Sequence, residues 1–535
     1  MPDHSEILRE TNFTSLDWVI VAVYLAVSIL IGVMVKKYST GMANYIGAGR
    51  SVGTWLGVAT MTGTELGLIT VMYSAEAGFT GGFAAFHIAL IAAIVTLLIG
   101  LTGFIVAPLR AEGVLTIPEF YERRFGRRTR ILGGIVLAFG GILNMGLFLK
   151  VGSMFIVGVA GLSESGWALP AVMTVLLTLV LVYTVLGGMI SVVITDYIQF
   201  VLLAVGMLLT TFMAINYLGW ERIVGTLQNS MGEKGWNPLV EEGPFGPAYV
   251  TWMAFLGLVG CAVWPTAVAR ALAMESSKAV RWQYTISSIS FAIRFMIPCF
   301  WGLCAYVFIM TDGAELKPLF FPTDAETKAM SGLYAMPIFL GRILPAGLIG
   351  IITAAMIAAF MSTHDSYLLC WGSVITQDVI APLSKKKLPD AKRVKLTRAI
   401  IVIIGLYILA WGLLYKGGDA IWSYMAITGA IYFTGAIPVL VGGIYWRRAS
   451  STGAFCSLLA GCTAVLGLEP LRFSMGELFL RGMGTIPLPR EAEACFTSER
   501  VGLFAVGLAM LAFVVGSLMC PDPVADDAQH SEESK

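Results

Sequence analysis

Long apolar runs alternate with short polar connections along most of the 535-residue chain. A helix needs about 20 predominantly apolar residues to cross the roughly 30 Å hydrocarbon layer of a membrane. Helices are required there because lipid offers the backbone no hydrogen-bond partners. The runs predict about thirteen transmembrane helices, at residues 16–36, 53–77, 82–108, 130–160, 167–189, 190–218, 249–272, 284–311, 344–380, 396–415, 421–446, 449–469 and 500–520.

Composition supports a membrane protein and excludes several other classes. The chain is 57% hydrophobic and only 13% charged, whereas about a quarter of the residues in a soluble protein are charged. A formal net charge of +1 argues against nucleic acid as a partner, which needs a clustered basic face. No nucleophile–base pair or metal motif appears in the sequence, so we expect no enzyme. The sequence therefore predicts an all-α polytopic membrane protein.

Basic residues gather in two connections, Arg110–Arg130 and Lys385–Arg398, which lie on the same side if the predicted helices are right. By the positive-inside rule this side is cytoplasmic. We therefore expect a multi-pass protein of the plasma (cytoplasmic) membrane with its N-terminus outside and its C-terminus inside. The expected regions are an extracytoplasmic N-terminus (1–15), a leading transmembrane helix (16–38), a ten-helix core (53–446), two peripheral transmembrane helices (449–520) and a cytoplasmic tail (521–535).

Two predicted helices carry features that break a helix inside the membrane. Span 53–77 contains a Thr/Gly-rich stretch with the ionisable Glu65 near its middle, and span 249–272 contains Gly257, Gly260 and Pro265. With the leading helix set aside, these are the first helices of two consecutive five-helix units. Paired broken helices indicate a binding site at the membrane midplane. The alternative is that the glycines only allow close helix packing; the presence of Glu65 and the matching positions favour a site.

A second polar cluster lies in span 344–380. Helical spacing puts Ala359, Ser362 and Thr363 on one face, and Ser362, Asp365 and Ser366 share the same spacing one turn later. Hydroxyl, carboxylate and carbonyl oxygens suit small hard cations. Alternatively, the hydroxyls only bond back to their own helix. Asp196 is a further acid candidate at depth.

Three motifs carry a resemblance to a known family. Tyr183–Gln199 is similar to the pattern Y-T-x-x-G-G-x-x-A-V-x-x-T-D-x-x-Q, Leu115–Phe125 resembles the loop T-I/L-P-E-x-x-x-x-R-F, and Ala359–Ser366 resembles an ion-binding helix. Together, and in this order, they resemble the sodium/solute symporter family, which includes carriers of proline, pantothenate, sialic acid and sugars. The resemblance implies a leucine-transporter-like (LeuT-like) 5+5 inverted repeat with one extra N-terminal helix, and sodium as the coupling ion.

The resemblance also implies which residues bind sodium. The family's common site corresponds here to the carbonyl groups of Gly63 and Leu66 and to Ala359, Ser362 and Thr363. Some members bind a second sodium, and the matching residues here are Asp196, Ser362, Asp365 and Ser366. Asp365 stands where the sialic acid carrier has serine, so this second site is either charged differently or absent. Glu65 stands where the proline carriers have aspartate.

The solute is predicted less directly. The sugar carriers' polar pocket residues are replaced by Thr70, Ala89 and Trp264, and Trp264–Arg270 is closer to the Q-P-x-x-x-x-R pattern of proline and pantothenate carriers. Arg294, midway along span 284–311, suits two-pronged binding of a carboxylate. Alternatively, Arg294 pairs with a structural acid such as Glu65 or Asp196.

Candidate solute-binding residues are therefore Glu65, Thr70, His87, Trp264 and Arg294; His87 either lines the pocket or fills a packing gap. We expect a sodium-coupled symporter importing a small carboxylate-bearing solute, such as a monocarboxylate, an amino acid or a pantothenate-like molecule. A sugar or polyol symporter is the alternative within the family. A transporter-like sensor is the alternative from another class, and the tail of about fifteen residues is too short for a folded signalling domain. The sequence indicates no oligomeric state.

Overall fold

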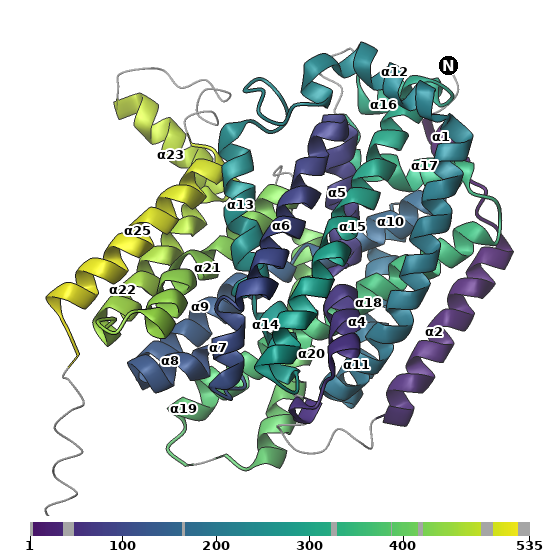
Figure 1. Ribbon diagram of the computed structural model, residues 1–535. Coiled ribbons are helices and arrows are strands. Elements are labelled where there is room, and N and C mark those ends of the chain that lie inside the picture. The colour runs from purple at the N-terminus through teal and green to yellow at the C-terminus, as the bar shows by residue number, and fades with distance from the viewer. Residues whose placement is uncertain are drawn as a thin grey trace, which may run out of the picture.

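A computed structural model describes residues 4–35, 48–162, 166–322, 329–386, 388–415, 421–482 and 496–522. Within these ranges the regular structure is helical, apart from one isolated bridge between Val52 and Met274. Long helices stand side by side in one bundle (Figure 1). Residues 36–38 of the predicted leading helix and residues 523–535 of the predicted tail lie outside the described parts.

The first half of the described chain contains eleven α-helices. They are α1 (His4–Arg9), α2 (Ser15–Val35), α4 (Thr54–Glu65), α5 (Leu68–Gly81), α6 (Phe86–Thr102), α7 (Val106–Ala111), α8 (Ile117–Phe125), α9 (Arg127–Met145), α10 (Phe148–Val159), α11 (Ala168–Leu218) and α12 (Trp220–Met231).

The second half continues the bundle and ends in a small peripheral group. Its helices are α13 (Pro247–Ala262), α14 (Pro265–Ala273), α15 (Ser277–Met310), α16 (Lys317–Phe320), α17 (Ala335–Ile343), α18 (Leu348–Val374), the π-helical η7 (Ile375–Ile380), α19 (Ala381–Leu383), α20 (Asp390–Leu414), α21 (Ile421–Tyr445), α22 (Ser451–Gly461), η8 (Cys462–Gly467), α23 (Glu469–Gly482) and α25 (Ser498–Met519).

Among the described residues, nine helices are long and apolar enough to cross a membrane, or ten if one bent pair counts as a single span. The prediction of an all-α polytopic membrane protein is therefore confirmed. The number thirteen remains a prediction, because several predicted spans are built from two shorter helices and one is only partly described.

Helical backbone continues across the predicted boundary at Gly187–Gly188, so that α11 has 51 residues. A straight helix of that length would be about 76 Å long, more than twice the hydrocarbon layer. α11 therefore cannot be straight within the membrane.

Both ends of α11 nevertheless lie on one side of the bundle. Thr11 donates to the carbonyl groups of Val159, shortly before α11, and of Gly341. Arg222, shortly after α11, pairs with Asp312 at 2.8 Å. Asp312 and Gly341 belong to one segment whose described helices have nine residues or fewer, so that segment stays on one side. α11 therefore enters the bundle and returns, and its two limbs correspond to the two predicted spans.

The predicted span 449–469 corresponds to α22 and η8 together, which cover Ser451–Gly467. α22 and η8 end at Gly467, and α23 leaves them at an angle of 83°. Leu468 is extended (φ −66°, ψ 140°), and Pro470, two residues later, has no N–H with which to continue the preceding helix. α22 packs along α25 and α21 at the edge of the bundle (Figure 1), so this region is peripheral, as predicted.

Both predicted breaks are present in the core. α4 and α5 are separated at Leu66 and Gly67, and α13 and α14 at Val263 and Trp264. Pro265 is the first residue of α14, where its missing N–H costs nothing. Leu66, Val263 and Trp264, at the two breaks, are buried, and irregular backbone at membrane depth is tolerated only when protein covers it.

The two basic connections lie on the same side of the bundle, as predicted. Arg124 donates to the carbonyl groups of Arg447 and Ala449, and Arg130 pairs with Asp378 near the end of α18. We call this end the basic side. Its cytoplasmic orientation remains a prediction.

Candidate ion and solute sites

The break between α4 and α5 is the element around which the candidate sites form. Leu66 leaves the helical region (φ −88°, ψ 61°) and Gly67 is extended. A Cβ atom on Gly67 would lie 2.3 Å from Oγ1 of Thr363, so only glycine allows α18 to approach the break this closely. The Thr/Gly-rich sequence of α4 therefore provides both the break and the space for its partner helix.

Thr363 is the predicted sodium ligand that faces the break most directly. Its hydroxyl donates to the carbonyl oxygen of Thr64 at 3.1 Å. Ala359, one turn earlier on α18, is fully buried. The structure thus brings the predicted α18 ligands to the end of α4. Carbonyl oxygens there accept hydrogen bonds from side chains as well as from backbone N–H groups.

Ser362 points to a different partner. Its hydroxyl donates to Asp196 on α11. A Cβ atom on Gly63 would lie 3.2 Å from the carbonyl oxygen of Asp196, so α4, α11 and α18 meet at this point. The predicted residues of the two sodium sites therefore form one continuous polar region, with Ser362 between them.

Asp196 is fully buried and receives several hydrogen bonds. Thr60 donates at 2.6 Å and Thr64 at 3.2 Å. The guanidinium of Arg270, on α14, lies 3.6 Å away, and both side chains are essentially inaccessible, at 1% for Arg270 and 0% for Asp196. A buried carboxylate needs such a counter-charge and donors.

Arg270 also reaches the other half of the predicted second site. It donates to the hydroxyl of Ser366, which in turn donates to Asp365 at 3.1 Å. The four residues predicted for a second sodium are therefore gathered, but with a cationic side chain among them. Arg270 was not among the predicted site residues, although it lies only six residues after the break at Trp264.

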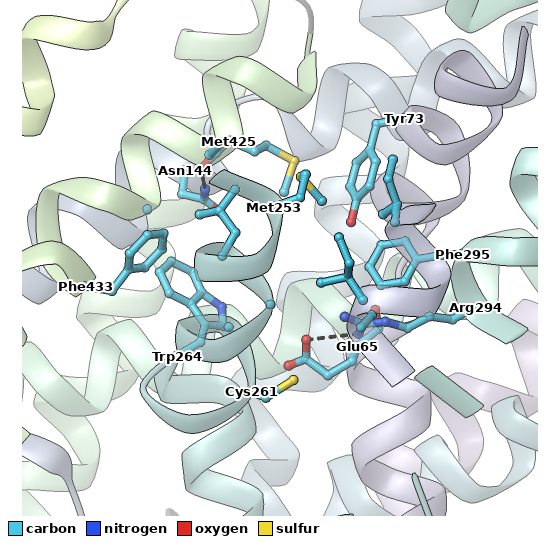
Figure 2. A pocket seen from close by; sticks show the side chains of 18 of the residues that line it. Glu65, Tyr73, Asn144, Met253, Cys261, Trp264, Arg294, Phe295, Met425 and Phe433 are labelled. Atoms are coloured by element: carbon cyan, nitrogen blue, oxygen red, sulfur yellow. Dashed lines mark hydrogen bonds and ion pairs between the residues drawn. The ribbon is translucent and has the colours of Figure 1, made fainter. Parts of the chain in front are cut away.

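A cavity of about 130 Å³ lies beside the break. It opens between the two broken helices, α9, α15 and α21, and its walls are mostly apolar (Figure 2). Its labelled lining residues are Glu65, Tyr73, Asn144, Met253, Cys261, Trp264, Arg294, Phe295, Met425 and Phe433. A mostly apolar cavity with a few convergent polar groups is typical of a small-molecule site.

The charged groups of the cavity are a paired Glu65 and Arg294 (Figure 2). Nη1 of Arg294 lies 3.2 Å from the Glu65 carboxylate and donates to the Glu65 carbonyl oxygen at 2.9 Å. Thr266 donates to the other carboxylate oxygen at 3.0 Å. The pairing of Arg294 with Glu65, one of the two alternatives from the sequence, is therefore present; the pairing with Asp196 belongs to Arg270.

The guanidinium of Arg294 has capacity beyond this pair. It lies over the rings of Phe291 and Phe295, at 3.9 and 4.5 Å from their centroids, and its buried Nε has no hydrogen-bond partner among the described residues. Each side chain of the pair is 11% exposed. The ion pair therefore holds Arg294 at the cavity wall through Nη1, and its Nε–H remains without an acceptor.

Further polar groups of the cavity were not predicted. Asn144 donates to the carbonyl oxygen of Met425 at 2.7 Å, and Trp264 donates to the hydroxyl of Tyr367 at 2.8 Å. The hydroxyl of Tyr73 points towards Phe295 and the ion pair (Figure 2). Asn144 lies in a span for which no break was predicted, and Tyr73 lies beyond the break in α5, so only the fold places these two side chains at the cavity.

Two candidate solute residues lie outside the lining of this cavity. Thr70 is buried in α5 and donates to the carbonyl oxygen of Glu65 at 3.3 Å, so it supports the break. His87 lies against the rings of Phe245 and Tyr249, at 4.9 and 5.9 Å. Glu65, Trp264 and Arg294 are the predicted solute residues that do line it.

Comparison with known proteins identifies the family. The sodium:solute symporter family matches residues 45–461. This chain belongs to that family. It is 24% identical over 502 residues to a sodium/glucose cotransporter of Vibrio parahaemolyticus, covering 87% of each chain. It is 23% identical over 474 residues to a sodium/proline symporter of Staphylococcus aureus (strain Newman), covering 84% of this chain and 85% of the relative.

The fold has a counterpart among solved structures. A Na⁺-coupled sialic acid symporter in a substrate-bound, outward-open state matches with a TM-score of 0.74 at 18% identity, covering 95% of this chain and 98% of that one. The family resemblance seen in the motifs is thus confirmed. The protein is a sodium-coupled symporter of the membrane rather than an enzyme, and its partners are a small solute, sodium and membrane lipid.

Proposed function

We propose that this symporter imports a small carboxylate-bearing solute, such as a monocarboxylate, an amino acid or a pantothenate-like molecule. The observation that carries the proposal is Arg294 on the wall of an otherwise mostly apolar cavity. A carboxylate can take the Nε edge of the guanidinium while Nη1 remains with Glu65. The apolar walls accommodate the hydrocarbon part of the solute.

A multiply hydroxylated solute fits this cavity less well. Each sugar hydroxyl that loses water needs a new partner, and an unpaired buried polar group costs roughly 1–3 kcal/mol. Met253, Leu256 and Phe433 occupy much of the wall. Because one relative is a sodium/glucose cotransporter, a sugar or polyol is the second candidate for the solute.

For the coupling ion we propose the carbonyl groups of Gly63 and Leu66 with Ala359, Ser362 and Thr363 as the first sodium site. Five oxygens around a broken helix match the preference of a hard cation. A sodium ion at this position would hold α18 against the break. Glu65 lies both at this break and in the lining of the solute cavity. Binding of sodium would therefore stabilise the conformation of the break that solute binding requires, and binding of solute would stabilise the conformation that sodium requires.

The cluster of Asp196, Ser362, Asp365 and Ser366 is proposed as the second cation site, with one restriction. Arg270 already compensates Asp196 at 3.6 Å. A second sodium would therefore depend on the negative charge of Asp365. The basic side of the bundle is proposed to be cytoplasmic, following the positive-inside rule.

Replacing Asp365 by asparagine should reduce the charge moved per solute by about one if this second site operates, because the neutral amide cannot compensate a second cation. The measurement is the ratio of charge to radiolabelled solute in proteoliposomes. Asp312→Asn, on the side opposite to the basic side, is the control and should leave the ratio unchanged. A wild-type ratio in the Asp365→Asn protein would contradict the second site.

The proposed solute class is tested by uptake into proteoliposomes with and without an inward sodium gradient. The panel contains lactate, propionate, proline, pantothenate, glucose and a polyol. We expect sodium-dependent accumulation of at least one carboxylate, and competition by others. Sodium-dependent uptake of glucose or the polyol with no competition from any carboxylate would rule out the proposed class.

A further inference from the structure

A cleft separate from the transport sites lies on the basic side of the bundle. It has a volume of about 340 Å³ and is formed where α8, α9, η7, α19 and α20 meet. We call it the basic cleft and define it by Glu122, Arg127, Arg130, Gln377, Lys386 and Arg393. α8 and α19 both lie at the lower end of the bundle in Figure 1.

The basic cleft carries an excess of positive charge. Four of its defining side chains are cationic, and two carboxylates oppose them: Glu122 on its wall and Asp378 behind Arg130. Both carboxylates contact the same guanidinium, that of Arg130. The other three cationic side chains, Arg127, Lys386 and Arg393, are thus available for an external anion.

Donors inside the cleft lack acceptors. Arg393 donates from Nη1 to Oε1 of Gln377 at 3.0 Å, which orients the amide. Nε2 of Gln377 and Nε of Arg393 are buried and have no hydrogen-bond partner among the described residues. Gln377 is only 7% exposed. Buried donors without acceptors are unfavourable, and an anion with several oxygens would satisfy them.

Apolar surface next to the cleft indicates where the anion comes from. Leu383, which follows the lining residues Ala381 and Pro382, is 61% exposed. Ile135 and Phe139, farther along α9 from the cleft, are also exposed. A soluble anion would make no favourable contact with these apolar side chains, whereas the acyl chains of a lipid would cover them.

We propose that the basic cleft binds the phosphate group of an anionic glycerophospholipid, with the acyl chains lying along Leu383 and the outer face of α9. Basic clefts between membrane helices recognise such headgroups through charge and hydrogen bonds. The bound lipid would join α9 to α20 through η7. Because η7 continues α18, which carries the proposed sodium ligands, the lipid would restrain the basic-side end of that helix.

The test uses the full-length protein in detergent, with lipid binding measured by native mass spectrometry. The variant Arg127→Gln with Lys386→Gln removes two exposed cations of the cleft. Its affinity for phosphatidylglycerol should fall about tenfold or more, since juxtamembrane cations contribute strongly to the binding of anionic lipid. Phosphatidylcholine should bind the wild type and this variant equally weakly.

The matched control is Arg128→Gln with Lys392→Gln, which removes the same charge from the same segments but outside the cleft lining. It should bind phosphatidylglycerol like the wild type. Thermal unfolding without added lipid verifies folding, and Lys386→Glu replaces the double variant if that protein is unstable. Equal loss in both double variants, or displacement of phosphatidylglycerol by millimolar inorganic phosphate, would overturn the proposal.

Discussion

Replacing Arg294 by lysine should weaken binding of the carboxylate solute by about 10- to 100-fold, because charge-assisted hydrogen bonds contribute roughly 1.5–3 kcal/mol. Lysine keeps the positive charge opposite Glu65, but it lacks the planar fork that serves Glu65 and a carboxylate together. Solute affinity measured by equilibrium binding at saturating sodium checks this. Sodium affinity should change by less than about twofold, since Arg294 is not among the proposed sodium ligands.

The matched control for this prediction is Arg281→Lys. Arg281 lies on the same helix, α15, and binds carbonyl groups of α6 away from the cavity. The Arg281→Lys protein should bind the solute with the affinity of the wild type. If the Arg294→Lys protein also binds the solute with wild-type affinity, Arg294 has no role in solute binding.

A pair of neutral substitutions separates solute binding from structural support. Arg294→Gln alone leaves Glu65 without its cationic partner, and breaking a buried pair costs roughly 3–5 kcal/mol. The side chains are 11% exposed, so we expect a loss at the lower end of that range. Adding Glu65→Gln should restore thermal stability but not solute binding. Recovery of both would make the pair structural only.

Removing both hydroxyls in Ser362→Ala with Thr363→Ala should raise the sodium concentration for half-maximal uptake about tenfold or more, a change of about 1.4 kcal/mol per factor of ten. The substitutions remove two of the five proposed ligands of the first sodium site. Uptake at a series of sodium concentrations, normalised to protein in the membrane, is the measurement.

The single substitutions should differ, because the two hydroxyls have different partners. Thr363 donates to the carbonyl oxygen of Thr64 at the break, so Thr363→Ala should affect mainly sodium dependence. Ser362 donates to Asp196, so Ser362→Ala should also lower thermal stability. Thr353→Ala is the control: this buried hydroxyl on α18 bonds back to Ile349. An unchanged sodium dependence in the double variant would exclude these ligands.

The lengths of several helices show where local sequence is insufficient. The predicted spans 167–189 and 190–218 correspond to the two limbs of α11, although helical backbone continues between them. The predicted span 449–469 corresponds to α22 and η8, but the 83° bend into α23 was not predicted. In both places the sequence predicted where a span ends, and packing against neighbouring helices determines the path of the chain beyond that point.

The sequence by itself determined the membrane class, the two broken helices and the polar faces of α18. These follow from local chemistry: apolar length, Gly and Pro in the middle of a span, and the 3.6-residue period. The motifs were also sufficient to indicate the family. Each of these features is contained within about 20 neighbouring residues, so no long-range contact is needed to predict it.

Only the tertiary structure decided how the buried charges pair. From the sequence, either Glu65 or Asp196 was a possible partner of Arg294. In the structure Arg294 pairs with Glu65, and Asp196 pairs with Arg270. These partners are separated by tens to hundreds of residues and lie on different helices. The cost of burying a charge requires that each one finds a partner, but which helix supplies it depends on how α4, α11, α14 and α15 pack together.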